Sequence, residues 1–336
     1  MFKKLLSGQR GSVVVIAVLA FSAIFGAAAL VVDMGNLYLN KTQVSNAADA
    51  AALAGAQQLP NDPDYANNIA RAYAGKNGPK SDTVTTAVAN DKKSIEVKIK
   101  RDVKLQFMSM FGLPTVSVTG KAKAQVSIAA SVPWIVPFVM QKPSAVDYDH
   151  EFVMCMYGAN NRKIIPGIDR KYWLDYMNVN IETNSWNDYV KYLEGGYSKT
   201  FEIGNDMKYY APSSGGQPSV DAFSNRTRKD TNTDYKEAKA GDARVMLIPL
   251  VDHMLPRDTR EGQKMGVVGF VAFFLEDVHK GSYGETFYAK GRFLKDFNIG
   301  SGKATSSADY DFGVRTIQLV NSKQAVIGNC ELPPKS

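Results

Sequence analysis

The sequence predicts an α+β protein. One long N-terminal transmembrane helix continues into a region of helix plus antiparallel sheet, and a β-rich C-terminal domain follows. Three observations carry this prediction: an uncharged apolar run near the N-terminus, an alanine-rich stretch after it, and alternation of apolar and polar residues further along. The chain has 336 residues, of which 45% are hydrophobic and 22% are charged. Such a composition is typical of folded proteins rather than disordered ones.

The apolar run extends from Val13 to Val32 and is interrupted only by Ser22 and Gly26. About twenty helical residues at 1.5 Å each span about 30 Å, the thickness of the hydrocarbon core of a bilayer. Basic residues precede the run and Asp33 follows it, and positive charge stays on the cytoplasmic side. We therefore expect a single-pass membrane protein with a cytoplasmic N-terminus and an exported C-terminal part.

Two other interpretations of the run stay open. A secretory signal peptide would be cleaved after small residues such as those at 27–29, although the run is longer than the apolar part of most signal peptides. The second alternative is a buried core helix of a soluble protein. The basic flank and the apolarity on all sides of the helix argue against it.

The helix is predicted to continue beyond the membrane to about residue 58, because this stretch lacks proline and is rich in alanine until Pro60. Its small side chains allow another backbone to approach closely, as between packed membrane helices. We expect Asn46, Asp49 and Gly55 to serve helix packing. The contact is either with another subunit or with strands of the same chain.

Two carboxylates interrupt this helix. Asp33 stands where the helix leaves the bilayer; it either marks the membrane edge or bonds to a neighbouring subunit or anchor partner. Asp49 lies within the alanine face, and a charge buried there needs a partner. Both are therefore candidate assembly residues.

Four stretches without gaps carry a family likeness: residues 11–16 (GSVVVI), the apolar run, residues 32–38 (VDMGNLY) and residues 43–56 (QVSNAADAAALAGA). They resemble the N-terminal motif of the TadE/TadG-like Flp (tight-adherence) pilus-assembly protein family, and a weaker likeness continues through residues 94–126. The resemblance implies a membrane-anchored, non-enzymatic structural component of a Tad/Flp-type pilus assembly and secretion system. It places the chain in the bacterial inner membrane, with its C-terminal part periplasmic or surface-exposed. It also implies as partners the inner membrane, pilins or other pilus-assembly proteins reached through the N-terminal helix, and further copies of the chain.

Two departures limit what the resemblance implies. Type IV-like pilins carry Glu at the fifth mature position, which would be Ile16 after cleavage at Gly11 or Val13 after cleavage at Gly8. Neither residue is acidic, which argues against polymerisation like a major pilin. A minor pilin-like filament subunit is therefore the alternative role and not the main hypothesis. The Asp-x-Ser-x-Ser metal motif of some TadG-like proteins is absent, so no metal-dependent adhesion site is expected. A membrane-tethered periplasmic ligand-binding or enzymatic domain is a further alternative.

Beyond the long helix, residues 64–77 are predicted to form a short helix that ends before Gly78 and Pro79. Alternating apolar and polar residues then predict antiparallel strands at 95–100, 103–107 and 116–126. Strict alternation gives the sheet one dry face and one wet face. The alanine-rich helix is the expected cover of the dry face.

A proline-rich change of composition around residues 131–143 sets the predicted domain boundary. The expected parts are a basic cytoplasmic tail, the long helix, a small α+β region and a β-rich exported domain, at 1–11, 12–59, 60–130 and 131–336. In the last part, apolar segments predict buried strands at 152–157, 244–251, 266–275 and 314–320. Polar segments predict loops at 213–218, 225–239 and 300–311.

No template for catalysis is complete in the sequence. The motifs Gly-x-Ser-x-Gly and Gly-x-Gly-x-x-Gly are absent, and the three histidines have no metal-ligand spacing. Asp147, Asp149 and Glu151 flank His150, yet they match no calcium-loop pattern. The net charge is +7, but no basic stripe alternates with aromatic residues, so nucleic acid is not an expected partner. We expect no catalytic residue, no metal and no cofactor.

The two cysteines, Cys155 and Cys330, form a candidate disulfide, because an exported domain meets an oxidising compartment. Two buried free thiols are the alternative. The sequence does not show whether the Cα atoms come close enough to be bridged.

Overall fold

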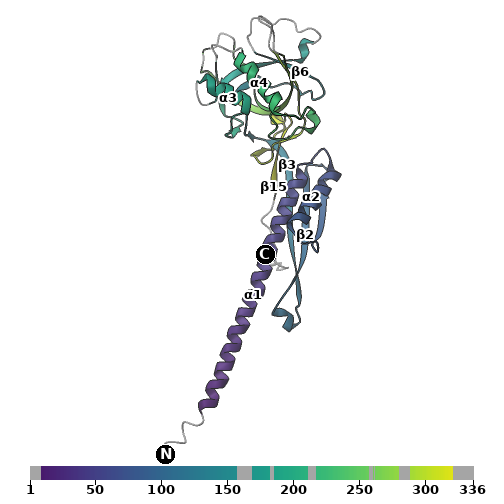
Figure 1. The fold of residues 1–336 in the computed structure, drawn as a ribbon, viewed down its shortest axis with the longest axis vertical. Helices are drawn as coiled ribbons and strands as arrows, with labels where there is room; N and C mark the ends of the chain where they lie inside the picture. Colours follow the sequence, from purple (N-terminus) through teal and green to yellow (C-terminus); the bar gives the residue numbers. More distant parts are fainter. Residues whose placement is uncertain are drawn as a thin grey trace, which may run out of the picture. The chain divides into compact units, whose positions relative to one another are not determined.

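The computed structural model describes residues 9–156, 169–181, 185–210, 217–256, 260, 262–279 and 288–320 (Figure 1). The chain divides into two compact units. Among the described residues, unit 1 holds residues 9–125 with residues 319 and 320, and unit 2 runs from Val126 to Gln318. The predicted fold class is confirmed: a long apolar helix comes first, a helix and an antiparallel sheet follow, and the C-terminal region is rich in β-structure.

The first helix, α1, runs without interruption from Gln9 to Ala56. Its two halves differ in burial. Side chains of the apolar run are exposed, with Phe25 and Val31 each 70% exposed, whereas Val44 is fully buried and marks the start of the packed half. Among the described residues, this is the one helix long and apolar enough to cross a membrane.

The second helix, α2 (Pro63–Asn77), packs against the second half of α1. It begins in a defined way, because the Asp62 side chain accepts a hydrogen bond from the N–H of Tyr65 and a proline occupies the first turn. Its buried residues are alanines spaced four apart, at positions 66, 70 and 74. This spacing puts them on one face, and their small size lets the two helices approach closely.

Three antiparallel strands complete unit 1: β1 (Thr83–Val88), β2 (Ser94–Lys104) and β3 (Thr115–Ala129), the last of which belongs to unit 1 up to Gln125. Buried and exposed residues alternate along β2, as predicted, and Ile95, Val97 and Ile99 are fully buried. Both helices pack on this sheet. A short 3₁₀ turn, η1 (Met108–Phe111), connects β2 to β3. The strands predicted at 95–100 and 103–107 join in one strand, β2, which ends at Lys104 and leaves residues 105–107 outside it. The strand β1 had not been predicted.

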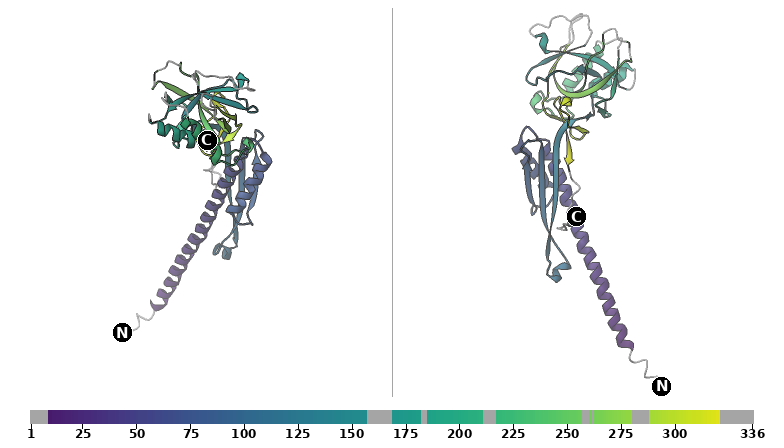
Figure 2. Two further views of the ribbon diagram at one scale, coloured as in Figure 1. Left: turned by 45° about the horizontal axis from the view of Figure 1, so that its top comes forward. Right: turned by 180° about the vertical axis from the view of Figure 1, so that it is seen from behind.

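In unit 2, the strands pair in a closed ring whose order is β10-β5-β7-β6-β12-β11 and back to β10 (Figure 2). Closing a sheet removes the free edges that would otherwise pair with other chains. The ring strands are β5 (Phe138–Gln141), β6 (Phe152–Met156), β7 (Trp173–Asn180), β10 (Val245–Val251), β11 (Lys264–His279) and β12 (Tyr288–Phe293), while β9 (Asp206–Tyr209) pairs with β7 and β11.

Both faces of the ring strands are buried. Phe138, Ile248 and Phe273 belong to one hydrophobic cluster, and Val139 and Phe274, which directly follow two of them, belong to another. The buried strands predicted at 244–251 and 266–275 are confirmed as β10 and β11, and residues 152–154 of β6 are buried as well. The segment predicted at 314–320 is a strand outside the ring and is buried mainly in its first half. The remaining elements are α3 (Trp186–Gly195), α4 (Gln217–Lys229) and the short strands β4 (Ser131–Val132), β8 (Phe201–Glu202), β13 (Phe297–Asn298), β14 (Ala304–Thr305) and β15 (Val314–Val320).

All three predicted loops are partly wrong, because α4 begins inside 213–218 and ends inside 225–239, and β14 lies inside 300–311. Residues 225–229 form the end of α4. Arg226 points inward there, and its guanidinium donates hydrogen bonds to the carbonyls of Leu193, Ala243 and Val245 at 2.6, 2.9 and 3.1 Å. These bonds hold the end of the helix against the rest of unit 2. Arg226 is 3% exposed, and burial lowers its pKa to about 10, so the side chain still carries its charge at neutral pH.

Candidate functional site

The carboxylate of Asp33 is buried, with 2% exposure, although it directly follows the exposed apolar run. Its Oδ1 accepts the N–H of Gln106 at 2.8 Å, and its Oδ2 accepts those of Phe107 and Met108 at 3.0 and 2.7 Å. These donors lie where β2 ends and η1 begins, so they have no strand partner. Asp33 therefore satisfies three free backbone donors and ties the β2–β3 connection to α1.

A second polar contact holds α1 to the sheet. The Arg101 guanidinium forms a bidentate pair with Asp82, with Nε–Oδ1 and Nη2–Oδ2 distances of 2.9 and 2.8 Å. Its Nη1 donates to Oδ1 of Asn40 at 3.1 Å and to Oε1 of Gln43 at 2.8 Å, and both acceptors belong to α1. The Arg101 and Asp82 side chains are 8% and 4% exposed. A paired and hydrogen-bonded arrangement is what allows charges to stay in such a place.

The three packing residues predicted within the alanine face have different surroundings. Asn46 is exposed. Gly55 is buried so tightly that a Cβ would lie 2.9 Å from the Ala66 carbonyl oxygen and from Ile95 Cδ1. Asp49 lies beyond the apolar run and makes no hydrogen bond or ion pair within the described part of the chain; partial burial raises the pKa of its carboxyl. The structure thus places Gly55 in a contact within unit 1, and leaves Asn46 and Asp49 partly or fully at the surface.

Gly120 of β3 lies directly against the backbone of α1, and the sequence patterns did not indicate this. A Cβ there would lie 2.5 Å from the Val44 carbonyl oxygen and 2.8 Å from the Ser45 nitrogen. Next to it, Lys41 Nζ donates a hydrogen bond to the Thr119 carbonyl. Only glycine fits where two backbones come this close.

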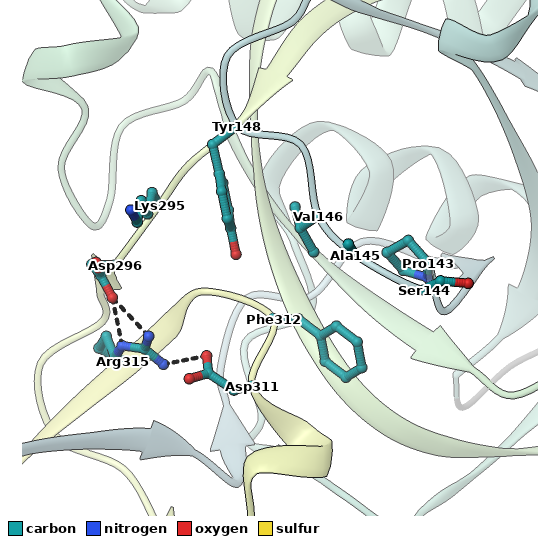
Figure 3. Close-up of a pocket in the computed structure, with 10 residues that line it drawn as sticks. All are labelled: Pro143, Ser144, Ala145, Val146, Tyr148, Lys295, Asp296, Asp311, Phe312 and Arg315. Carbon is teal, nitrogen blue, oxygen red and sulfur yellow. Dashed lines mark hydrogen bonds and ion pairs between the residues drawn. The ribbon is translucent and has the colours of Figure 1, made fainter.

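A cavity of about 330 Å³ in unit 2 is the candidate for ligand binding or catalysis (Figure 3). Arg315 lies in its wall between two carboxylates, with Nη2 2.7 Å from Asp296 Oδ1 and Nη1 2.5 Å from Asp311 Oδ1. Burial, together with the charge of Asp311, raises the pKa of Tyr148 to about 12. The charge of Arg315 is already balanced by the two carboxylates, and the Tyr148 hydroxyl stays protonated near pH 7. Neither is suited to bind an anion or to transfer a proton near pH 7.

Asp147, Asp149 and Glu151 each make a contact with another residue of the chain. His150 Nδ1 lies 2.7 Å from Asp147 Oδ2, and this hydrogen bond is the main reason why the pKa of Asp147 is lowered. Lys290 Nζ lies 3.4 Å from Glu151 Oε1, and Arg292 donates to the carbonyl of Asp149 at 2.8 Å. Within the described ranges, no group of three or more His, Cys, Asp or Glu side chains converges as metal ligands would.

The candidate disulfide stays a prediction. Cys330 lies outside the described residues. The backbone of Cys155 is in β6, in register with Asp175 of β7.

Comparison with known proteins gives one finding. Residues 11–58 match a family model described as "Putative Flp pilus-assembly TadE/G-like". No curated protein and no solved structure gives a significant match. The matched residues cover the apolar run, Asp33 and the packed half of α1, so the membrane-type helix and its contacts with the sheet coincide with the family's segment. Residues 11–58 of this chain are therefore similar to the TadE/G-like segment described for Flp pilus assembly.

Proposed function

We propose that this protein is a membrane-anchored, non-enzymatic structural component of a Tad/Flp-type pilus assembly and secretion system. The observation that carries the proposal is the coincidence of the family match at residues 11–58 with the apolar helix. Exposing this run to water would be strongly unfavourable, because burial of apolar surface is worth about 25 cal/mol per Å². A bilayer supplies the missing apolar surroundings.

The proposed topology is a cytoplasmic N-terminus with both units on the periplasmic side. The basic residues before Val13 and the acidic residue after Val32 support it. In unit 1, the second half of α1 packs on α2 and on β2, which supports an aqueous location for the body of this unit.

The proposed partners are pilins or other assembly proteins that meet α1. The alanine face is occupied by α2 and the sheet of the same chain, so it is not free for a partner. Met34 and Tyr38 remain 69% and 68% exposed just beyond the run. They lie about one turn apart on α1, as side chains that meet one partner helix do, and we assign the partner contact to them.

The alternative is a minor pilin-like subunit that enters the filament. Intact N-terminal peptides, found by mass spectrometry in membranes and absent from sheared surface filaments, are expected for a permanent anchor. A terminus at Ser12, found in sheared filaments, would sink the anchor proposal and establish the filament role. A terminus after residues 27–29, found in soluble periplasm, would instead identify a cleaved signal peptide.

A further inference from the structure

The connection between β2 and β3, which we call the hairpin tip (residues 105–114), presents apolar side chains that no described part of the chain covers. Met110 is 82% exposed, Leu113 is 50% exposed and Phe107 is 41% exposed. They follow each other in one tight turn that closes at Gly112, whose φ of +83° lies in the left-handed region. Turns that face water are usually built from polar residues, so this concentration of apolar surface points to a contact.

The contacts along α1 fix where the tip lies. Val44 is beside Gly120, Lys41 donates to the Thr119 carbonyl, and Asn36 Nδ2 lies 3.3 Å from the Lys104 carbonyl oxygen. Asp33 then accepts the N–H groups at the start of η1. Residues closer to the N-terminus of α1 thus contact positions closer to the hairpin tip. The tip therefore lies beside the last turn of the apolar run (Figure 2).

The backbone of the tip is suited to a medium without water. The N–H groups of Gln106, Phe107 and Met108 bond to Asp33. Within the turn, the N–H groups of Met110, Gly112 and Leu113 bond to the carbonyls of Phe107, Ser109 and Met108 at 3.1–3.2 Å, and Pro114 has no N–H. A segment that enters lipid must satisfy its polar groups internally, and these six donors are satisfied.

We propose that the hairpin tip inserts into the membrane interface beside the anchor helix, so that unit 1 contacts the bilayer at two points. This inference rests on the proposed function, because it takes residues 13–32 as the membrane span. Lipid is the occupant because the exposed surface of the tip lies beside the exposed surface of the apolar run. Met, Phe and Leu side chains partition into this zone, and the exposed Lys104 at the base of the tip suits anionic headgroups.

The experiment places single added tryptophans in the full chain reconstituted in nanodiscs with brominated or ordinary phospholipids. Bromine on the acyl chains quenches a tryptophan that it contacts. The parent protein, with its three tryptophans in unit 2, supplies the background. The variants are Met110→Trp at the tip, Phe21→Trp in the apolar run and Lys93→Trp in the exposed turn between β1 and β2. All three side chains are exposed in the chain, so the changes leave the fold intact.

The proposal predicts that brominated lipid quenches the added emission of Met110→Trp and Phe21→Trp, and leaves that of Lys93→Trp unchanged. Quenching of Phe21→Trp alone would overturn the insertion of the tip and leave the anchor standing. A blue-shifted but unquenched Met110→Trp would show that protein, either a partner or a second copy, covers the tip instead. An unquenched Phe21→Trp would refute the membrane span, and the tip proposal with it.

Discussion

Replacing Gly120 with alanine is expected to destabilise unit 1 and leave unit 2 unchanged. The new Cβ would lie 2.5 Å from the Val44 carbonyl oxygen, 2.6 Å from its carbonyl carbon and 2.8 Å from the Ser45 nitrogen. All three are backbone atoms of α1, which cannot rotate away. β3 cannot shift freely either, because it is held in register by β2, with Gly120 opposite Ile99.

The size of the effect follows from the geometry. An extra methyl group in a well-packed core costs about 1–3 kcal/mol. Because the atoms that it meets belong to helix backbone, we expect the upper part of that range, about 2–3 kcal/mol in the free energy of opening of unit 1. A tenfold change in an equilibrium constant corresponds to about 1.4 kcal/mol, so this is about a 30- to 150-fold change.

Gly75→Ala is the matched control. Gly75 lies inside α2, and no atom comes within 4 Å of the position of an added Cβ. Alanine in place of glycine within a helix stabilises it by about 0.5–1 kcal/mol. The same chemical change is therefore expected to have opposite signs at the two positions.

Hydrogen exchange of the full chain in nanodiscs measures both effects separately for each unit. Amides of β2 and β3 should exchange about 30- to 150-fold faster in Gly120→Ala and more slowly in Gly75→Ala, while those of β10 and β11 should be unaffected. Exchange of β2 within threefold of the parent in Gly120→Ala would refute the close contact of β3 with α1.

Three further predictions concern other parts of the structure. Arg101→Ala leaves the Asp82 charge buried and unpaired, and should lower the free energy of unfolding of unit 1 by about 3–5 kcal/mol in a urea titration. The double variant Arg101→Ala with Asp82→Ala should lose less stability, because no unpaired charge is left. An equal or larger loss in the double variant would contradict the pairing. Arg226→Leu leaves the carbonyls of Leu193, Ala243 and Val245 without their hydrogen-bond donor. Thermal unfolding should show that unit 2 alone loses about 3 kcal/mol of stability. The control Arg228→Leu, on the exposed side of α4, should lose less than about 0.5 kcal/mol. Because burial raises the pKa of Asp49, the folded chain binds this proton more tightly than the unfolded chain, and stability should fall as the pH rises from 3.8 through the raised pKa. In Asp49→Asn this contribution to the pH dependence should vanish, and an unaltered pH profile of hydrogen exchange in unit 1 would contradict the assignment.

Sequence patterns predicted the parts of the fold that depend on local chemistry. The apolar run and the alanines gave the length of α1 to within a few residues, and alternation gave the dry face of β2. The same alternation also contains a sign of the buried ion pair. Arg101 occupies an inward position in the series that includes Ile99 and Val103, and a charge at an inward position indicates a buried partner, which proved to be Asp82.

Other features depend on distant pairings that no local pattern encodes. The ring of unit 2 requires Met140 to pair with Leu250 in parallel, across more than a hundred residues of sequence. The role of Asp33 depends likewise on donors that are far along the chain and become free only because β2 ends there. β1 was missed because Thr83–Val88 is short and its side chains are only half-buried or exposed.

The absence of any break in α1 has a mechanical consequence. The helix contains no proline from Gln9 to Ala56, and its second half is built into the core of unit 1. Hinges and kinks in helices usually arise at proline or at inserted groups. Asp33 and Arg101 brace the helix against the sheet at two levels, so the two move as one body. A pull or twist applied to unit 1 from outside is therefore passed to the apolar run, the proposed membrane span, as tilt or rotation, rather than being absorbed by a flexible joint.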